Sequence, residues 1–283
     1  MEEILFTKMH GTGNDYVYIN CLDVTPSRIP QLAIDMSRPH TGIGADGIIL
    51  ILPSDKADFK MRIFNADGSE ALMCGNGSRC VGKYVWDHRL TESSDITLET
   101  LSGIKRLHLH TGAGGTVSSV TVDMGTPSTL CRDIPVNHKG QNMIDCPVQT
   151  SSGEMRLTAI SMGNPHGVIF TECIDSLNLP SIGRELETHP MWPDRANIEF
   201  AQVISPNEII MRVWERGSGE TMACGTGACA TAVAAAITGR CGRDVTVHLR
   251  GGDLQITHAP DGRILMTGEA ATVFEGRYFH KTK

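Results

Sequence analysis

The chain has 283 residues, of which 40% are hydrophobic and 20% charged, and its formal net charge is −7. This length and apolar content predict two ordinary domains or one large one, with a sizeable core. The mildly acidic balance gives no electrostatic reason to expect nucleic acid as a partner, which leaves small metabolites open.

The N-terminal stretch MEEILFTKMHGTG lacks the basic and apolar regions of a signal peptide. No run approaches the roughly 18 apolar residues that a membrane-spanning helix needs. The nine cysteines are spread over the whole length and fit neither a small secreted disulfide framework nor a zinc site. We therefore expect reduced thiols, a cytoplasmic location, no membrane partner and no metal.

Short runs rich in β-branched residues fill most of the chain, and clusters of Gly, Asn, Asp and Pro separate them, which predicts many strands. In the first half the expected strands are 4–8, 16–20, 47–52, 58–64, 95–100, 104–110 and 116–124. In the second half they are 155–161, 166–171, 198–204, 208–214, 245–250, 252–258 and 263–270.

Two clear helices are expected, at 75–88 and 225–239. The second, GTGACATAVAAAITG, has small residues on nearly every face, which suits a helix enclosed by a barrel-like sheet. Many strands around one buried helix in each half predict an α+β fold. The stretch 125–136 contains two prolines and breaks the strand pattern, so we expect domains at 1–124 and 125–268.

The two halves repeat each other at an offset of 150 residues. MRIFNADGSEALMCGNG (61–77) aligns without a gap to MRVWERGSGETMACGTG (211–227), and six of 17 positions are identical. A weaker echo joins 9–15 to 162–168. We interpret the repeat as a duplication. The alternative is one useful helix-start loop that occurs twice without a shared function.

Each repeat places a cysteine, Cys74 or Cys224, directly before a glycine-rich helix start. A helix N-terminus offers unpaired N–H groups and a positive dipole end, so it binds carboxylates and stabilises thiolates. We therefore expect lowered thiol pKa values. Two such loops facing each other would hold a carboxylate and place a carbon between two sulfurs. One thiolate could then remove a proton and the other thiol return one, which is two-base racemisation without a cofactor.

Two other patterns have plainer interpretations. The remaining cysteines are expected to pack as small apolar side chains. They are Cys21, Cys80, Cys131, Cys146, Cys173, Cys229 and Cys241. The run GIGADG (42–47) matches a dinucleotide-binding fingerprint, but a strand-like run follows it where a helix is required. We therefore interpret this run as a turn.

Several motifs together resemble the diaminopimelate epimerase family, whose members work without pyridoxal phosphate. The matching blocks are HGTGNDY (10–16), FNADGSEALMCGNGSRC (64–80), MGNPHGV (162–168), AN (196–197), WERGSGETMACGTGACA (214–230) and TGEAATVFEG (267–276). The resemblance implies two pseudo-symmetric domains, each a barrel-like sheet around a central helix. It also implies that 269–283 returns to the first domain and that the active site lies in the cleft between the domains.

The same resemblance implies a reaction and an acid–base pair. The activity is epimerisation of LL-2,6-diaminopimelate to the meso form, in lysine and peptidoglycan precursor biosynthesis, with no cofactor and with a homodimer as the assembly. For this direction Cys224 would accept the proton and Cys74 would donate one. The residues implied to bind the reacting carboxylate through helix-start N–H groups are Gly75, Asn76, Gly225 and Thr226.

The remaining implied roles concern substrate binding. Asn14 would hold the amino group at the reacting end, and His166 would tune the thiol pKa values together with Glu215. The residues implied to hold the far amino-acid group are Asn65, Asn164, Asn197, Glu215 and Arg216. One departure is that some family members carry Gln where this chain has Gly47, so any substrate contact from that side chain is absent.

Two alternatives stay open at this stage. A related two-cysteine racemase acting on proline, hydroxyproline or histidine would use the same thiol chemistry, although the asparagines with Glu215 and Arg216 favour a substrate with a second amino-acid end. A protein of a different class would be a non-catalytic redox sensor in which Cys74 and Cys224 form a switchable disulfide. Exchange of substrate α-protons with solvent separates an enzyme from a sensor.

Overall fold

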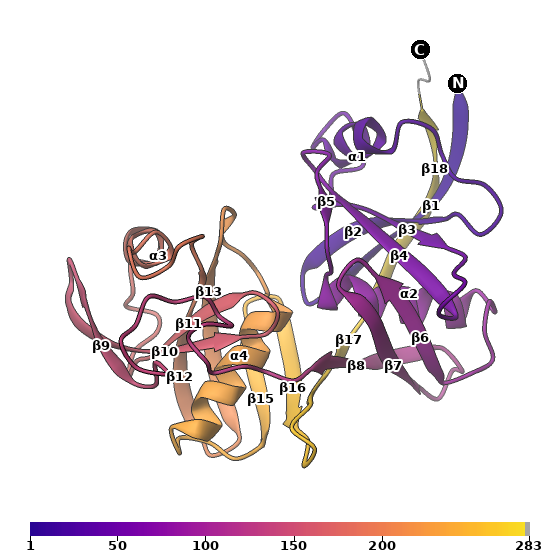
Figure 1. Ribbon diagram of the computed structural model, residues 1–283. Coiled ribbons are helices and arrows are strands. Elements are labelled where there is room, and N and C mark those ends of the chain that lie inside the picture. The colour runs from indigo at the N-terminus through magenta and orange to yellow at the C-terminus, as the bar shows by residue number, and fades with distance from the viewer. Residues whose placement is uncertain (281–283) are drawn as a thin grey trace. The chain divides into compact units, whose positions relative to one another are not determined.

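The computed structural model describes residues 1–280, and the chain divides into two compact units (Figure 1). Unit 1 comprises Met1–Val122 and the chain from Gly268 onward, and unit 2 comprises Asp123–Thr267. Each unit has a mixed sheet, one long buried helix and one short helix. The α+β fold expected from the sequence is confirmed. No helix in residues 1–280 is long and apolar enough to cross a membrane.

Unit 1 is built on a sheet in which the first strand of the chain pairs with the last. Figure 1 shows β18 (Ala271–His280) beside β1 (Glu2–Gly11), and the two run antiparallel. The other strands are β2 (Asn14–Asn20), β3 (Gly47–Leu52), β4 (Phe59–Asn65), β5 (Glu70–Ala71), β6 (Asp95–Thr100), β7 (Gly103–Thr111) and β8 (Val117–Gly125). The helices are α1 (Ile29–Ser37) and α2 (Gly75–Asp87).

From β10 onward, unit 2 has the same kinds of elements in the same order as unit 1 has from β1 to β8. Its strands are β9 (Cys146–Thr150), β10 (Gly153–Ser161), β11 (Pro165–Phe170), β12 (Asn197–Ser205), β13 (Glu208–Glu215), β14 (Gly219–Glu220), β15 (Asp244–Leu249), β16 (Gly252–His258) and β17 (Ile264–Glu269). Its helices are α3 (Leu179–Glu187) and α4 (Gly225–Ile237).

The strand pairings follow one series in both units. In unit 1 the pairs β1–β2, β2–β3, β3–β4, β4–β6 and β6–β7 are antiparallel, parallel, antiparallel, parallel and antiparallel. In unit 2 the pairs β10–β11, β11–β12, β12–β13, β13–β15 and β15–β16 have the same five directions in turn. Equivalent positions can therefore be compared between the units.

The long helices lie against the sheets as their sequences predict. Helix α4 packs on strands β10, β11, β12, β15 and β16, and ten of its residues, mostly Ala and Gly, are buried. Small side chains let the strands approach α4 from every side, so the enclosure expected for this helix is confirmed. Helix α2 is buried along most of its length and contains the fully buried Arg79.

One expectation for single residues differs from the structure, and one is confirmed. Cys173 is exposed, and Cys146 and Cys241 are only half-buried, so the expectation that every one of these cysteines packs in the core is wrong. Cys173 lies in the loop after β11 rather than in a sheet, which explains its exposure. The GIGADG run is a turn between α1 and β3, as expected, and a Cβ added at Gly47 would lie 2.1 Å from the carbonyl oxygen of Phe64.

Candidate active site

The two cysteines of the sequence repeat, Cys74 and Cys224, each occupy the N-cap position of a long buried helix. Cys74 precedes α2 with φ −137° and ψ 116°, and Cys224 precedes α4 with φ −127° and ψ 111°. The Sγ of Cys74 accepts a hydrogen bond from the Gly77 N–H at 3.3 Å. The first turn of a helix leaves its N–H groups without intrahelical partners, so each cysteine lies beside a site suited to a carboxylate.

In unit 1 the thiol of Cys74 forms a hydrogen bond with the side-chain amide of Asn14, which is itself bonded to Asp46. The thiol donates to Asn14 Oδ1 at 3.3 Å, and Asn14 Nδ2 donates to Asp46 Oδ2 at 2.7 Å. The same Asp46 oxygen accepts from the Asp15 N–H at 3.2 Å. Burial, and secondarily the charge of Asp15, raises the pKa of Asp46 above its ordinary value. Asp46 lies in the GIGADG turn, and its role was not anticipated from the sequence.

The other candidate binding residues of unit 1 have separate partners. Asn76 lies in the first turn of α2, and its side-chain oxygen accepts from the buried guanidinium of Arg79 at 3.0 Å. Asn65 ends β4, and its Nδ2 donates to Ser69 Oγ at 3.1 Å. Unit 1 therefore brings Asn14 to Cys74 directly, whereas the amides of Asn65 and Asn76 are held by neighbours other than the thiol.

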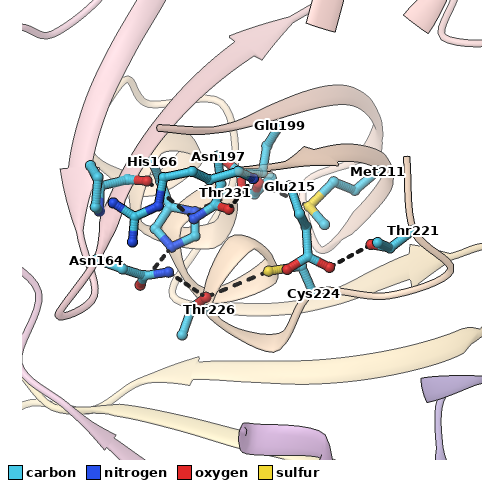
Figure 2. Close-up of polar contacts among 12 residues, drawn as sticks. Asn164, His166, Asn197, Glu199, Met211, Glu215, Thr221, Cys224, Thr226 and Thr231 are labelled. Atoms are coloured by element: carbon cyan, nitrogen blue, oxygen red, sulfur yellow. Dashed lines mark hydrogen bonds and ion pairs between the residues drawn. The ribbon is translucent and has the colours of Figure 1, made fainter. Parts of the chain in front are cut away.

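In unit 2 a chain of hydrogen bonds leads from a buried carboxylate to Cys224 (Figure 2). His166 Nδ1 lies 2.7 Å from Glu199 Oε1, and both side chains are fully buried. His166 Nε2 lies 3.0 Å from Asn164 Oδ1. Asn164 Nδ2 donates to Thr226 Oγ1 at 3.4 Å, and this hydroxyl lies 3.5 Å from Cys224 Sγ.

A second carboxylate, Glu215, contacts Cys224 from the end of β13. It accepts from Thr221 Oγ1 at 2.5 Å and also takes a hydrogen bond from the Cys224 thiol. Burial raises the pKa of Glu215, although these two hydrogen bonds oppose the shift. A carboxylate with a raised pKa in contact with a thiol is suited to accept the thiol proton.

The expectation of a lowered pKa is wrong for Cys224. Burial raises its pKa well above the ordinary value, and the charges of Glu215 and Glu199 raise it further. The hydrogen bonds from Thr226 and from the Gly227 N–H act in the opposite direction but are smaller effects. The helix N-terminus thus does not outweigh desolvation here, because the side chain is only 6% exposed and two carboxylates are near.

A separate set of hydrogen bonds involves Asn197 and Arg216. Asn197 Nδ2 donates to the Pro165 carbonyl at 3.2 Å, and the Arg216 N–H donates to Asn197 Oδ1 at 2.9 Å. The guanidinium of Arg216 donates to the Asp194 carbonyl at 3.2 Å, and the residue is exposed. Asn197 thus ties the start of β11 to the turn after β13, which presents the Arg216 side chain at the surface.

Glu199 is a member of the site that sequence reasoning missed. Its signal is a single acidic residue inside NIEFA, a run in which all five residues are buried. A fully buried carboxylate is rare unless it is paired, so an acidic residue in this run predicts a charged or hydrogen-bonding partner nearby. The partner, His166, lies 33 residues away in the sequence and reaches Glu199 only because β11 and β12 are adjacent.

Gly227 leaves the space that Glu199 occupies, which gives a testable consequence. A Cβ at Gly227 would lie 2.6 Å from Glu199 Oε1. Because Glu199 is enclosed, we expect Gly227→Ala to displace it, to cost about 1–3 kcal/mol of stability and to lower turnover at least tenfold. In Gly77→Ala the added methyl would come closest to the flexible Cδ1 end of Ile49, at 2.7 Å, and would lie in ordinary contact with Cys74 Cβ at 3.4 Å, so a smaller loss is expected. Melting temperatures and turnover rates of both variants test this, and equal losses would contradict it.

Comparison with solved structures defines the class of fold. A hydroxyproline epimerase from Agrobacterium vitis matches with a TM-score of 0.69 at 16% identity, over 97% of this chain and 92% of that chain. A PhzF-family phenazine biosynthesis protein from Bacillus anthracis matches with a TM-score of 0.71 at 17% identity, over 99% of this chain and 100% of that one. The fold is therefore the two-domain α+β fold that PhzF proteins share with amino-acid epimerases.

Sequence comparison is more specific. A diaminopimelate epimerase from Phocaeicola vulgatus is 54% identical over 96% of this chain and 97% of its own length. One from Desulfovibrio desulfuricans is 51% identical over 97% of this chain and 98% of its own. The model of the diaminopimelate epimerase family matches residues 6–130 and 158–273. The chain belongs to the diaminopimelate epimerase family and is an isomerase.

Proposed function

We propose that this enzyme interconverts LL- and meso-2,6-diaminopimelate by proton transfer between the substrate and two thiols, without a cofactor. The observation that carries the proposal is that each unit places a cysteine at the N-cap of its long buried helix, within the same series of strand pairings. Family membership supports the substrate.

In the proposed reaction both helix starts bind the same α-carboxylate, and the α-carbon lies between the two sulfurs. The backbone N–H groups assigned to the carboxylate belong to Gly75, Asn76, Gly225 and Thr226. In the LL-to-meso direction Glu215 takes the proton of Cys224, and the thiolate removes the α-proton. The electron pair left on the α-carbon then takes the thiol proton of Cys74 on the opposite face, which inverts the centre.

The remaining polar residues are assigned to the two ends of the substrate. Asn14 Oδ1 accepts from the α-ammonium, since the hydrogen bond of Asn14 to Asp46 turns this oxygen toward Cys74. The exposed guanidinium of Arg216 suits the far carboxylate through its planar pair of donors. The far amino-acid group is assigned to Asn65, Asn164, Asn197, Glu215 and Arg216.

We further propose that the enzyme acts as a cytoplasmic homodimer that supplies lysine and peptidoglycan precursors. Family membership supports the pathway, and nine free cysteines suit a reducing compartment. The paired strands β1 and β18 expose the large apolar side chains of Leu5, Phe274 and Phe279, which supports an interface on unit 1. Light scattering during size-exclusion chromatography should give twice the chain mass, and the mass of one chain would reject the dimer.

The direct test of the function is incubation with LL-diaminopimelate in deuterated water. We expect the meso isomer to appear with deuterium at the inverted α-carbon, because the returning proton comes from a thiol that exchanges with solvent. A sample that neither inverts the centre nor exchanges the α-proton would reject the function. Proline, hydroxyproline and histidine serve as comparison substrates, on which we expect no inversion.

Activity should not depend on pyridoxal phosphate. Two thiols that exchange protons with one carbon leave no task for a Schiff-base lysine. Enzyme dialysed against hydroxylamine and then against buffer should keep its full epimerisation rate, and adding pyridoxal phosphate should leave that rate unchanged. An activity that is lost on dialysis and restored by the cofactor would contradict this prediction.

A further inference from the structure

The turn that follows β13 carries Arg216 and has few contacts of its own with the core. Arg216 and the next two residues are exposed, and Gly217 and Gly219 have positive φ angles of 77° and 81°. Glycines contribute no side chain that could anchor such a turn. The position of the Arg216 side chain therefore depends on hydrogen bonds that reach the turn from other parts of unit 2.

Glu187, the last residue of α3, accepts two of these hydrogen bonds. Its Oε1 accepts from the Gly217 N–H at 2.9 Å, and its Oε2 accepts from the indole Nε1 of Trp214 at 2.8 Å. The Glu187 side chain is only 7% exposed, and the Arg195 guanidinium lies 3.6 Å from Oε1. One buried carboxylate thus holds the chain both before and after Arg216.

The backbone of Glu187 is joined to a second segment that contacts Arg216. The Glu187 carbonyl accepts from the Ala196 N–H at 3.3 Å. The residues near Ala196 bind the arginine directly: the Asp194 carbonyl accepts from its guanidinium at 3.2 Å, and Asn197 Oδ1 accepts from its N–H at 2.9 Å. Glu187 therefore connects the turn after β13 with the segment that leads into β12.

The guanidinium of Arg216 stays suited to an anion in this arrangement. Glu187 bonds to N–H groups of neighbouring residues, and within residues 1–280 no ion pair joins it to Arg216. The Asp194 carbonyl that accepts from the guanidinium is uncharged. The backbone of Arg216 is thus held while the charge of its side chain is left for the far carboxylate of the substrate.

The equivalent helix of unit 1 shows that packing alone does not require Glu187. Helix α1 has nine residues, as α3 does, and the offset of 150 residues places Ser37 at the position of Glu187 and Phe64 at that of Trp214. The Ser37 hydroxyl has no hydrogen-bond partner among residues 1–280, and phenylalanine has no N–H to donate. Unit 1 therefore has neither the carboxylate nor the indole donor at these positions.

A third difference between the two helices matches the larger ring of Trp214. At the same offset Gly183 of α3 corresponds to Ala33 of α1. A Cβ at Gly183 would lie 2.6 Å from Trp214 Cγ, whereas Ala33 packs in the same core cluster as the smaller Phe64. Unit 2 thus lacks a methyl group where the indole lies, and it buries a carboxylate at a cost in desolvation. Holding the turn after β13 accounts for both features.

We propose that Glu187 is a positioning residue for substrate binding, which fixes the turn after β13 so that Arg216 is oriented for the far carboxylate of the substrate. The inference rests on the proposed function for the role of Arg216, whereas the effect of Glu187 on the turn can be tested without substrate. Glu187 acts through the backbone of Gly217 and the ring of Trp214 rather than by touching the substrate.

The first test measures exchange of the Gly217 amide proton with water by NMR, in the full chain without substrate. The hydrogen bond to Glu187 protects this proton, although Gly217 itself is exposed. Glu187→Gln has almost the same shape, but a side-chain amide has only one acceptor oxygen for the two donors. We expect exchange at Gly217 to become about tenfold faster in this variant.

The second test separates KM from kcat in the epimerisation of diaminopimelate. The far carboxylate is bound before and during proton transfer, so a less ordered Arg216 weakens both states alike. We expect Glu187→Gln to raise KM roughly tenfold, because the turn must then be ordered on binding, and to leave kcat within about threefold of wild type. A merely structural role would reduce the amount of folded enzyme, which lowers the apparent kcat but does not change KM.

A double variant shows whether Glu187 acts through Arg216. In the Arg216→Ala background we expect Glu187→Gln to change kcat/KM by less than about twofold, because the side chain that it positions is absent. Losses that multiply in the double variant would show that Glu187 affects binding by another route and would overturn the inference.

Glu185→Gln is the matched control. Glu185 lies on the same helix and also accepts two hydrogen bonds, from the N–H and the hydroxyl of Ser151 at 2.7 and 2.5 Å. The same acid-to-amide change there disturbs a comparable pair of bonds that does not reach the turn after β13. We expect KM and the Gly217 exchange rate to stay within about twofold of wild type in this control.

Trp214→Phe keeps the test decisive if Glu187→Gln does not fold. Phenylalanine is the residue that unit 1 has at the equivalent position, Phe64, and the change removes the indole donor. One oxygen of Glu187 then loses its partner, so the Gly217 exchange rate and KM should both rise, although less than in Glu187→Gln. An unchanged exchange rate and an unchanged KM would overturn the inference.

Failure of the inference and failure of the proposed function give different results. Either an unchanged KM or an unchanged Gly217 exchange rate in folded Glu187→Gln would overturn the inference, even if the wild type epimerises diaminopimelate. A wild type that does not epimerise diaminopimelate would reject the proposed function, and the exchange measurement would still decide whether Glu187 holds the turn.

Discussion

Cys74→Ser and Cys224→Ser should each lose epimerisation by several orders of magnitude while substrate affinity survives. A hydroxyl is a much weaker acid than a thiol, so serine is a poor general base near neutral pH. The helix-start N–H groups that receive the carboxylate do not depend on the cysteine side chain. The expected pattern is therefore a fall in kcat with a nearly unchanged Kd, measured by stopped-flow turnover and by calorimetric binding.

Elimination from a β-halogenated analogue shows which thiol serves which face. Elimination needs proton removal on one side only, so each variant retains the base for one stereoisomer. Cys224→Ser should act poorly on the isomer with its α-proton toward position 224 and normally on the other, and Cys74→Ser should show the opposite preference. Equal loss of both eliminations, or near wild-type epimerisation by either variant, would show that the two-base assignment is wrong.

Arg79→Ala should lower the free energy of unfolding by about 4 kcal/mol, the largest stability effect we expect from one substitution. The side chain is fully buried, and its guanidinium donates to Glu269 O at 3.2 Å, Asn76 Oδ1 at 3.0 Å and Thr12 Oγ1 at 3.2 Å. The alanine leaves a cavity and three acceptors that have lost this donor, and the hydrogen bonds to Asn76 and Thr12 are buried.

A surface arginine is the control for this effect. Arg62 is 34% exposed and pairs with Glu70 at 2.7 Å, and Arg62→Ala should cost no more than about 1 kcal/mol. Urea unfolding followed by far-UV circular dichroism compares the two variants. A cost below that of Arg62→Ala would show that the buried guanidinium is not what holds these three segments together.

Most of the architecture was readable from local patterns. Alternation identified β6 at its observed bounds, because one face of that strand is buried, and β3 was identified as a continuous apolar run, which is buried on both faces. The short helices α1 and α3 were not predicted. Each has nine residues with a proline near its start and no side-chain cap, so it is stabilised chiefly by packing its apolar face on the core.

Part of the candidate site was likewise predictable from the sequence and part was not. The positions of Cys74 and Cys224 at helix starts followed from glycine spacing, which is local information. Asp46 and Glu199 act on residues 32 and 33 positions away, across neighbouring strands. The residues next to Asp46 and Glu199 in the sequence do not identify these partners, because the contacts arise only from the pairing of neighbouring strands. The raised pKa of Cys224 was missed for the same reason, since burial and neighbouring carboxylates are properties of the folded unit.

The pairing of β1 with β18 fixes an order of events during synthesis. Unit 2 is one continuous segment, Asp123–Thr267, and can fold as soon as that segment has left the ribosome. Unit 1, although it begins the chain, stays incomplete until β18 emerges. Until then β1 presents an open edge on the side away from β2, and open edges invite pairing with other chains. The part of the enzyme that is made first is therefore the last to be finished, and the nascent chain carries an exposed strand edge throughout the translation of unit 2.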